Sequence, residues 1–281
     1  MRTEIESKRE GEGEERGAAV DRAPLSENGA GAVLEDVEVI WRQVPKVSGR
    51  GHYAHRLLFD EEGFLWISSG ERQKFTPSQD MQSNLGKLLR LRDDGSIPGD
   101  NPFVDSRDVD GRSGTAPVSA QVWSLGHRNP LGMDFDLQGR LWAIEMGPAG
   151  GDELNLIQRG GNYGYPLVSN GDHYNGDPIP DHSTRPEFIE PAIWWTPVIS
   201  PADLTVYRGD LFADWRGNAL VAGLGSRGIV RIALDRDGAR EVERYDLDAR
   251  IRSVVEGPNG ALWVLEDERG SSKGRLLKLT P

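Results

Sequence analysis

Apolar residues recur in short runs separated by acidic and glycine-rich turns, and this pattern repeats four times along the chain. Each unit has an apolar strand, a turn, a second strand and a further strand downstream. The four units begin with the segments RLLFDEEGFLWISSG, GMDFDLQGRLWAIEMG, DLTVYRGDLFADWRGNALVAGL and RSVVEGPNGALWVLED. Helical periodicity is weak throughout, so the pattern predicts an all-β protein built from many short strands.

The turns of the four units share a glycine, and three of the strands that follow share a tryptophan. The glycines are Gly63, Gly139, Gly217 and Gly260, and the tryptophans are Trp66, Trp142 and Trp263. A strand–turn–strand unit cannot bury its faces alone, so repeats of this size usually pack radially as propeller blades. A β-sandwich is the alternative that the pattern leaves open. The repeat spacing favours a β-propeller.

Ahead of the four units, the segments AAVDRAPL and DVEVIWRQV form a partial unit of the same kind. We therefore expect about five blades, the first of them incomplete at its N-terminal side, in a single domain over residues 18–281. Residues 1–17 alternate acids, bases and glycines without an apolar stretch. This composition predicts a disordered segment that is not a signal peptide.

The composition excludes several classes of function. The chain has 33 Lys and Arg against 45 Asp and Glu, a net charge of −12, whereas a nucleic-acid partner needs a cationic face. It has no cysteine, so disulfides and thiolate metal sites are excluded. No apolar run approaches the roughly 18–20 residues that a membrane span requires.

Four ordered segments carry a resemblance to a known family. They are SGRGHYAHRLLFD, LGHRNPLGMDFD, EMGPAGGDELNLIQRGGNYGYP and ARIRSVVEGPNGALWVLED. Together they resemble the soluble pyrroloquinoline quinone (PQQ)-dependent aldose sugar dehydrogenases, the glucose/sorbosone dehydrogenase family. The resemblance implies a six-bladed β-propeller that binds PQQ and calcium and oxidises an aldose at C1 to the lactone. It also implies a periplasmic location and an electron acceptor that the sequence does not name.

Two features depart from the family pattern. The family has a further region ahead of the point where this match begins, including a segment that contributes a glutamine to the PQQ site. In AGLGSRGI, many members carry a PQQ-contacting lysine directly after the leucine. This chain has Gly225 there, with Arg227 as the nearby cation that would substitute.

His52 lies in GHYAHRL, where the resemblance places the catalytic base. Oxidation to a lactone requires removal of the C1 hydroxyl proton, and imidazole is suited to this because it titrates near working pH. A loop histidine without a role is the alternative. His55 falls where many relatives have glycine, and we assign it no catalytic role.

Arg128 and Asn129 lie in GHRNP, on a turn at a strand end. A quinone with three carboxylates needs fixed cationic donors, and a guanidinium fits both carboxylate and quinone oxygen. The resemblance makes both residues PQQ ligands and gives Arg128 a catalytic role in stabilising developing negative charge. A structural arginine paired with a neighbouring acid is the alternative. His127 is expected to be structural.

Arg250 and Arg252 alternate across Ile251, which in a strand puts both guanidinium groups on one face. Two like charges side by side are unfavourable unless an anion lies between them. The resemblance places PQQ carboxylates here, and an exposed strand face is the alternative. Tyr174 in GDHYNG matches a family position against the plane of the cofactor, and its alternative is a loop tyrosine that satisfies a backbone group.

The segment EMGPAGGDELN places three carboxylates and three glycines around one proline. Calcium takes carbonyl, carboxylate and water oxygens, and glycines let a backbone turn its carbonyls inward. The resemblance assigns a PQQ-linked calcium to the carbonyls of Gly147 and Pro148, and a second, structural calcium to Glu153 and Tyr163. A tight turn with solvated acids is the alternative. Zinc is disfavoured because the chain lacks cysteine and paired-histidine spacing.

Three readings of function follow. The first is a PQQ- and calcium-dependent aldose dehydrogenase with His52 as general base. The second is a calcium-stabilised propeller that binds carbohydrate or a partner without turnover, favoured by the incomplete first blade and by Gly225. The third is a truncated product that needs an oligomer or a missing segment to fold. The sequence determines neither the sugar nor the oligomeric state.

Overall fold

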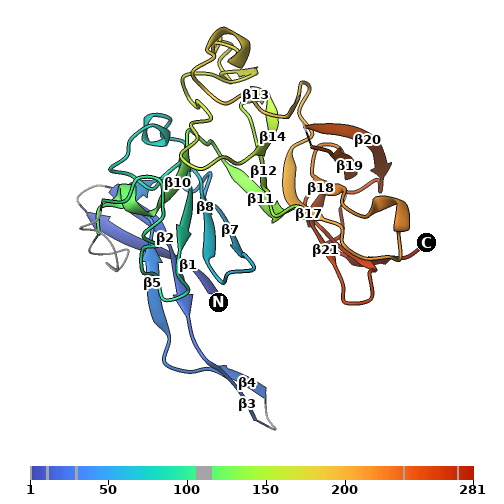
Figure 1. The fold of residues 1–281 in the computed structure, drawn as a ribbon, viewed down its shortest axis with the longest axis horizontal. Helices are drawn as coiled ribbons and strands as arrows, with labels where there is room; N and C mark the ends of the chain where they lie inside the picture. Colours follow the sequence, from blue (N-terminus) through green and yellow to red (C-terminus); the bar gives the residue numbers. More distant parts are fainter. Residues whose placement is uncertain (1, 11–12, 29–30, 106–115, 237, 271) are drawn as a thin grey trace.

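The computed structural model describes residues 2–10, 13–28, 31–105, 116–236, 238–270 and 272–281. Within them nearly all regular structure is β-strand, and five antiparallel sheets follow one another in chain order, from blue to red in Figure 1. The prediction of an all-β protein is confirmed. None of the helices in this part of the chain is long and apolar enough to cross a membrane.

Each sheet is built from consecutive segments of the chain. The first sheet contains β1 (Arg2–Glu10), β2 (Gly13–Arg22), β5 (Glu38–Arg42) and β6 (Val47–Ser48). The second contains β7 (Ala54–Phe59), β8 (Leu65–Ser69), β9 (Lys87–Leu91) and β10 (Val122–Leu125). The third contains β11 (Pro130–Phe135), β12 (Leu141–Glu145), β14 (Asp152–Leu156) and β16 (Ile193–Trp195).

The last two sheets follow the same plan. The fourth contains β17 (Pro201–Val206), β18 (Ala219–Gly223), β19 (Gly228–Leu234) and β20 (Ala239–Asp246). The fifth contains β21 (Ile251–Glu256), β22 (Leu262–Glu266) and β23 (Leu276–Leu279). Short 3₁₀ helices lie in the connections, namely η1 (Thr76–Ser78), η2 (Val118–Gln121), η3 (His182–Thr184) and η4 (Ala213–Trp215). The strand pairs that the four sequence units predict are therefore all present.

The sheets pack against one another around a common centre. Strand β7 lies against β11, β11 against β17, and β17 against β21, so the first strands of four sheets are neighbours. Apolar cores fill the spaces between consecutive sheets; large members of the four cores are, in order along the arc, Trp41, Trp66, Trp142 and Tyr207. This radial packing confirms the β-propeller, and the five sheets agree with the expected number of about five blades.

The turn glycines of the four units all adopt the left-handed backbone conformation. The angle φ is 85° at Gly63, 75° at Gly139, 79° at Gly217 and 76° at Gly260. Side chains with a Cβ rarely adopt this conformation, whereas glycine does so at little cost. Backbone geometry therefore explains why glycine recurs at this position of each unit.

An aspartate completes the turn in two of the sheets. Oδ2 of Asp60 accepts the indole N–H of Trp66 at 2.8 Å, and Oδ2 of Asp136 accepts that of Trp142 at 2.9 Å. The fifth sheet has glycine at the equivalent position, and its Trp263 keeps 37% of its surface exposed. The recurring tryptophan is thus buried under the turn where the aspartate is present to accept its N–H.

The N-terminal segment differs from the expectation of disorder over residues 1–17. Apart from residues 1 and 11–12, which lie outside the described residues, it forms β1 and the first part of β2. The two strands pair antiparallel, with Lys8 opposite Glu15 and Arg9 opposite Glu14 in the backbone register. The segment is too polar to form a core of its own. It pairs with β2, which contributes Ala18 to the first core.

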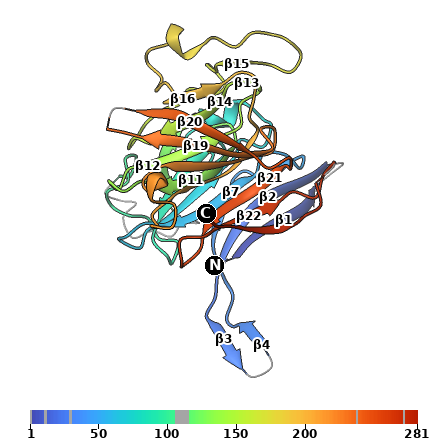
Figure 2. The same cartoon turned by 90° about the vertical axis from the view of Figure 1, so that its right-hand side faces the viewer.

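Two short ribbons leave the sheets at opposite ends (Figure 2). One pairs β3 (Leu25–Asn28) with β4 (Gly31–Leu34), and the other pairs β13 (Ala149–Gly150) with β15 (Gly171–Asp172). The β13–β15 ribbon belongs to the loops that surround the candidate site.

Candidate functional site

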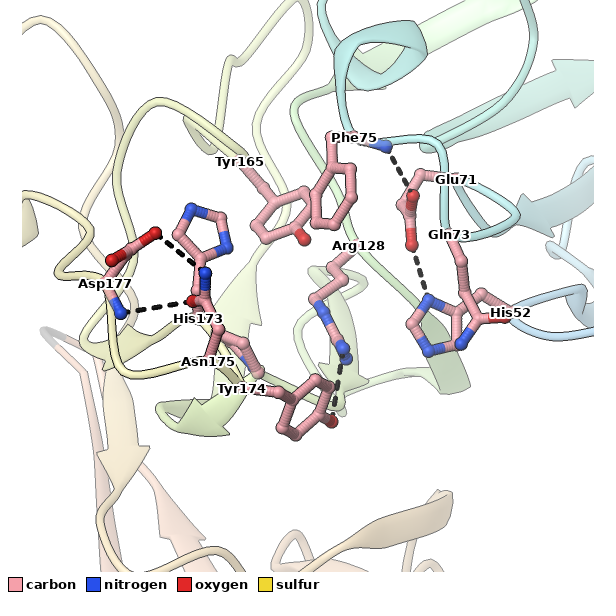
Figure 3. A pocket seen from close by; sticks show the side chains of 11 residues that line it. His52, Glu71, Gln73, Phe75, Arg128, Tyr165, His173, Tyr174, Asn175 and Asp177 are labelled. Atoms are coloured by element: carbon pink, nitrogen blue, oxygen red, sulfur yellow. Dashed lines mark hydrogen bonds and ion pairs between the residues drawn. The ribbon is translucent and has the colours of Figure 1, made fainter.

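Loops at one end of the sheets enclose a pocket of about 410 Å³ (Figure 3). Because β7–β8 and β11–β12 are antiparallel pairs, the starts of β7 and β11 meet the ends of β8 and β12 there. The lining residues are His52, Glu71, Gln73, Phe75, Arg128, Pro148, Tyr165, His173, Tyr174, Asn175 and Asp177. The structure thus brings together four residues that the sequence analysis singled out: His52, Arg128, Pro148 and Tyr174.

His52 is held by a buried carboxylate. Its Nδ1 is hydrogen-bonded to Oε1 of Glu71, whose side chain is fully buried, whereas 16% of the His52 side chain is exposed. A carboxylate accepts a hydrogen bond, so this contact selects the tautomer with a proton on Nδ1 and leaves Nε2 as an acceptor. An imidazole fixed in this way can act as a general base.

Glu71 is ionised in its buried position. Its Oε2 accepts the backbone N–H of Phe75 at 2.8 Å. Burial raises the pKa of Glu71, but the hydrogen bonds from His52 and from the backbone of Phe75 outweigh burial and hold the pKa below its ordinary value. The sequence analysis missed Glu71. The signal available was an acidic residue directly after the buried strand β8 and its glycine.

Arg128 is a cation held by backbone carbonyls. Its Nη1 donates to the oxygens of Met146 at 2.9 Å and Gly147 at 2.7 Å, and its Nη2 donates to the Tyr174 hydroxyl at 3.3 Å. Its guanidinium carbon lies 5.8 Å from the centre of the Tyr165 ring. Within the described chain, its buried Nε has no hydrogen-bond partner. Arg128 can therefore offer both charge and a donor to an anion in the pocket.

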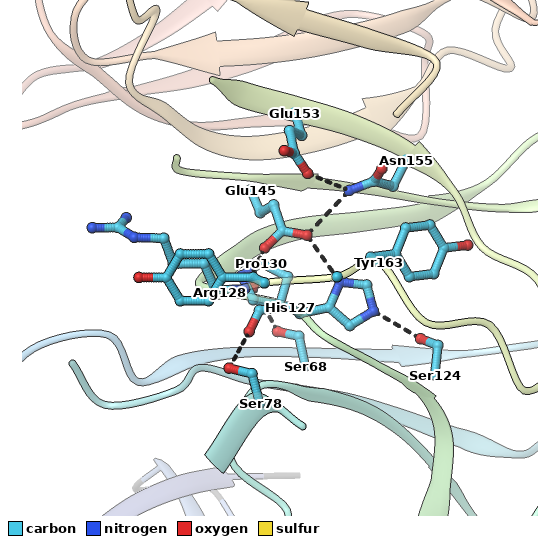
Figure 4. Close-up of polar contacts among 12 residues, drawn as sticks. Ser68, Ser78, Ser124, His127, Arg128, Pro130, Glu145, Glu153, Asn155 and Tyr163 are labelled. Carbon is cyan, nitrogen blue, oxygen red and sulfur yellow. Dashed lines mark hydrogen bonds and ion pairs between the residues drawn. The ribbon is translucent and has the colours of Figure 1, made fainter. Parts of the chain in front are cut away.

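A buried polar network that includes Glu145, His127 and Ser124 adjoins Arg128 (Figure 4). Glu145 accepts the backbone N–H of Arg128 at 2.6 Å through Oε2, and contacts His127 Nδ1 at 2.9 Å through Oε1. His127 Nε2 lies 2.8 Å from the Ser124 hydroxyl, and its ring stacks on Tyr163 at 4.7 Å. Burial raises the pKa of Glu145, but His127 and the backbone donors bring it below the ordinary value. His127 thus occupies a structural position, as expected.

Asn129 and Tyr174 lie differently with respect to the pocket. Asn129 is buried, and its Oδ1 has no hydrogen-bond partner among the described residues, but it does not line the pocket. Tyr174 is 75% exposed, and its hydroxyl meets Arg128. Contact of either residue with PQQ stays a prediction.

A second pocket of about 420 Å³ adjoins the first and shares Pro148 and Tyr174 with it. Asp152 lines this pocket and holds the turn. Its Oδ1 accepts the N–H of Gly147 at 3.0 Å, and its Oδ2 accepts that of Ser200 at 2.7 Å. Burial raises the pKa of Asp152 to about 6, although these backbone donors act in the opposite direction.

The Gly147–Pro148 turn fits a calcium ion. A Cβ added at Gly147 would lie 2.1 Å from the carbonyl oxygen of Gly151, so only glycine fits the turn. The Gly147 carbonyl already faces a cation, the guanidinium of Arg128. Carbonyl oxygens beside the Asp152 carboxylate are the kind of donor set that calcium prefers.

Glu153 and Tyr163, predicted to hold a second calcium, have other partners. The carbonyl oxygen of Tyr163 accepts a hydrogen bond from Nε2 of buried His182 at 3.1 Å. Glu153 is buried 3.4 Å from Asn155 Nδ2, and burial together with Glu145 raises its pKa well above the ordinary value. In the described ranges, no group of three or more His, Asp or Glu is placed to hold a metal. The assignment of a second calcium to Glu153 and Tyr163 stays a prediction.

Arg250 and Arg252 share the carboxylate of Asp267. Nε of Arg250 lies 3.1 Å and Nη2 of Arg252 lies 3.3 Å from Asp267 Oδ2. Neither arginine lines either of the two pockets. The anion between the two like charges is therefore a side chain of the protein itself, and their contact with PQQ stays a prediction.

The expectation that Arg227 substitutes for the family's lysine stays a prediction. Arg227 pairs with Asp248 at 2.6 Å and lines neither pocket. A Cβ added at Gly225 would lie 2.9 Å from the carbonyl oxygen of Ile199, so a lysine there would require the backbone to shift. Neither position supplies a cation to either of the two pockets.

The first pocket has the chemistry that a flat, tricarboxylated quinone requires. Phe75, Tyr165 and Tyr174 supply aromatic surface, and Arg128 supplies a cation whose Nε lacks a partner within the described chain. Guanidinium groups bind carboxylate and quinone oxygens well. The residues present therefore fit PQQ, and contact of Arg128 with PQQ stays a prediction.

Comparison with known proteins agrees with this chemistry. The family model for Glucose / Sorbosone dehydrogenase matches residues 5–278. Aldose sugar dehydrogenase YliI of Escherichia coli (strain K12) is 36% identical over 255 residues, which cover 88% of this chain. The chain spans 65% of that relative's length.

Solved structures agree in fold along nearly the whole chain. A crystal structure of a glucose dehydrogenase is 37% identical with a TM-score of 0.85, and the match covers 99% of this chain and 78% of that one. The PQQ-bound form of an aldose sugar dehydrogenase from Streptomyces coelicolor is 26% identical with a TM-score of 0.67, covering 99% and 75%. This chain belongs to the Glucose / Sorbosone dehydrogenase family.

Proposed function

We propose that this protein oxidises an aldose at C1 to the lactone, with PQQ and calcium as cofactors and His52 as general base. The observation that carries the proposal is the His52–Glu71 pair, which shares a pocket with Arg128. Oxidation removes a proton from the C1 hydroxyl and a hydride from C1. A base with a free acceptor nitrogen suits the first step, and a buried cation stabilises the negative charge that the second produces.

His52 acts on the hydroxyl group of C1. When bound, PQQ would supply the acceptor for the hydride from C1, and calcium would polarise that acceptor. Nε2 of His52 takes the O1 proton, so the O–H bond breaks as the C1–O1 double bond of the lactone forms. The ionised Glu71 keeps the imidazole in place and stabilises the imidazolium that results.

Other residues would bind calcium or PQQ and orient them in the pocket. The carbonyls of Gly147 and Pro148 would hold calcium, and Arg128 would bind a quinone or carboxylate oxygen and stabilise negative charge there. Tyr174 covers Arg128 from the loop that begins at β15. Asn129, Arg250 and Arg252 complete the proposed set of PQQ ligands that the family resemblance implies.

The substrate side of the pocket is polar. His173, Asn175 and Asp177 line it, and Asn175 Nδ2 donates to Asp177 Oδ2 at 2.7 Å. Amide and carboxylate groups of this kind bind sugar hydroxyls, which supports an aldose as the substrate class. The proposal places the protein in the periplasm and includes a separate electron acceptor.

A second candidate function is calcium-stabilised binding of a carbohydrate or a partner without turnover. The observation that favours it is the engagement of Arg250 and Arg252 by Asp267, which leaves Arg128 as the cation at the pocket. The two candidates differ in whether a bound sugar is oxidised.

Reconstitution of the full chain with PQQ and calcium, followed by dye reduction with a panel of aldoses, tests the proposal. Wild type and Arg216→Ala, a surface variant, are expected to reduce the dye, and His52→Ala is expected to lose about 10²–10⁴-fold in rate. PQQ binding without reduction by any aldose would favour the second candidate. Equal rates in wild type and His52→Ala would remove His52 from the mechanism.

A further inference from the structure

Arg72 is a buried cation whose side chain bonds mainly to backbone carbonyls of the loop before His52. Only 1% of Arg72 is exposed. Its Nε donates to the carbonyl oxygen of Gly51 at 2.9 Å, and its Nη2 donates to that of Gly49 at 2.6 Å. Its Nη1 donates to the carbonyl oxygen of Arg16 at 2.9 Å. The guanidinium therefore joins the His52 loop to strand β2.

Arg72 also contacts the loop at His52 and at the residue that follows it, Tyr53. Its guanidinium carbon lies 3.5 Å from the centre of the Tyr53 ring, a cation–π contact. Its backbone N–H donates to the carbonyl oxygen of His52 at 3.2 Å. Arg72 thus contacts the loop over residues 49–53 before, at and after His52, through its side chain and its backbone N–H.

The backbone here adopts conformations that need support. The angle φ is 48° at His52 and 61° at Arg72, in the left-handed region that residues other than glycine rarely adopt. Such residues persist only where surrounding structure determines them, and they cluster at functional sites. A Cβ added at Gly70 would lie 2.1 Å from the His52 carbonyl oxygen, so the two segments are in direct contact.

Glu71 and Arg72 are therefore adjacent residues that hold His52 in two ways. Glu71 fixes the imidazole, while Arg72 fixes the backbone from which the imidazole projects. A planar guanidinium can donate to two carbonyls and stack on a ring at the same time, whereas a lysine ammonium is a point charge without that geometry. A lysine at this position would keep the positive charge but could not donate to the carbonyls of Gly49 and Gly51 in the same geometry.

We propose that Arg72 is a positioning residue for His52: it sets the His52–Glu71 hydrogen bond and thereby the aim of Nε2 into the pocket. Its effect on turnover rests on the proposed function, but its effect on the His52–Glu71 bond does not. A displacement of about 1 Å in a catalytic group can cost 10²-fold in rate.

The test compares two buried arginines in the same sheet region. Arg90 is 5% exposed, donates to Asp100 at 2.8 Å and stacks on Phe64 at 3.7 Å, so it is a matched control remote from the His52 loop. Arg72→Lys and Arg72→Met would be measured beside Arg90→Lys and Arg90→Met. Tyr53→Leu removes the ring on which the Arg72 guanidinium stacks and leaves Arg72 unchanged. This variant tests the proposal if the Arg72 variants do not fold.

The first readout is the NMR signal of the His52 Nδ1 proton bonded to Glu71, measured without PQQ or calcium. The His127 proton bonded to Glu145 gives an internal reference in the same spectrum. We expect the Arg72 and Tyr53 variants to lose or broaden the His52 signal and keep that of His127, and the Arg90 variants to keep both. An unchanged His52 signal in Arg72→Lys and Tyr53→Leu would overturn the proposal.

The second readout is steady-state kinetics after reconstitution. We expect kcat to fall about 10–100-fold in Arg72→Lys and KM to change less than about threefold, because binding groups stay in place. Equal losses in the Arg72 and Arg90 variants would show a general effect of a lost buried cation and overturn the proposal. Absence of turnover in wild type would contradict the proposed function, while the NMR result would still decide the role of Arg72.

Discussion

Nη1 of Arg128 lies 2.7 Å from the carbonyl oxygen of Gly147, where the proposed function puts a calcium ion. A guanidinium and a divalent cation repel each other and seek the same oxygen. We therefore expect calcium binding to shift the Arg128 side chain away from this carbonyl. That movement would free its Nη1, next to the Nε that has no partner within the described chain, for a ligand in the pocket.

Arg128→Met should affect calcium binding and dye reduction in different ways. Removal of the competing cation should leave calcium affinity equal or up to about tenfold tighter, a change of about 1.4 kcal/mol. The same change should lower dye reduction by about 10²-fold, because a main charge-stabilising donor is gone. Calorimetric titration with calcium and a rate assay check the two parts. Loss of calcium binding in Arg128→Met would contradict the competition.

An ion pair between sheets should contribute strongly to stability. Nη2 of Arg56 on β7 lies 2.6 Å from Oδ1 of Asp203 on β17, and Asp203 also accepts the Ser253 hydroxyl and the Val254 N–H on β21. Asp203→Asn removes the charge partner of a partly exposed arginine and weakens the hydrogen bonds to β21, so it should cost about 2 kcal/mol in free energy of unfolding.

Chemical denaturation measures this loss. Asp210→Asn is the matched control, since Asp210 pairs with Arg216 but its side chain is 91% exposed. An exposed pair of this kind should contribute less than about 1 kcal/mol. Similar losses in the two variants would show that Asp203 does not link the strands as described.

His55 should make the fold sensitive to acid. The ring lies between Trp41 and Tyr53, and burial, with a smaller effect of Arg72, lowers the pKa of His55 from 6.5 to about 3. A pKa lower in the folded state contributes stability above the unfolded pKa, and this is lost as the pH falls through the window from 6.5 towards 3.

His55→Phe removes the titrating group while keeping a ring of similar size. Between pH 7 and pH 5, wild type should lose about 2 kcal/mol of unfolding free energy relative to His55→Phe, since only the unfolded chain is protonated there. Urea unfolding at the two pH values gives the difference. If the difference in unfolding free energy between wild type and His55→Phe is the same at pH 7 and pH 5, His55 is protonated in the folded protein as readily as in the unfolded chain.

Calcium should bind the Gly147–Pro148 turn more tightly than the site proposed at Glu153 and Tyr163. Nε2 of His182 occupies the carbonyl oxygen of Tyr163, and the raised pKa of Glu153 favours its protonated form. Equilibrium dialysis with elemental analysis should therefore give about one tightly bound calcium per chain, weakened in Asp152→Asn, which removes the carboxylate charge beside the turn. Two calcium ions of similar affinity would show that the second site assembles after all.

The repeat was predictable because it follows from local chemistry. The glycine turns and strand pairs depend on residues close in sequence, such as Gly63 with its φ of 85° and the Asp60–Trp66 hydrogen bond. The pairing of the polar strand β1 was not predictable, because it is made by backbone contacts with β2 and the sequence of β1 has no apolar alternation that indicates a strand.

The site was predictable only in part, for a similar reason. Motifs identified His52 and Arg128, but Glu71 and Arg72 act through contacts that the sequence does not display, 19 and 21 positions from their partners His52 and Gly51. Arg250 and Arg252 show the opposite case. Their alternation indicated an anion between them, and the anion present is Asp267, which no pattern pointed to.

The most direct test of the account is rapid-mixing measurement of the reductive half-reaction with an aldose deuterated at C1, in wild type and Glu71→Gln. The account predicts an isotope effect above about 2 in wild type, and a rate about 10²-fold lower in Glu71→Gln, because the base loses its orientation and its counter-charge. Equal rates in the two proteins, or a rate indifferent to deuterium at C1 under single-turnover conditions, would contradict it.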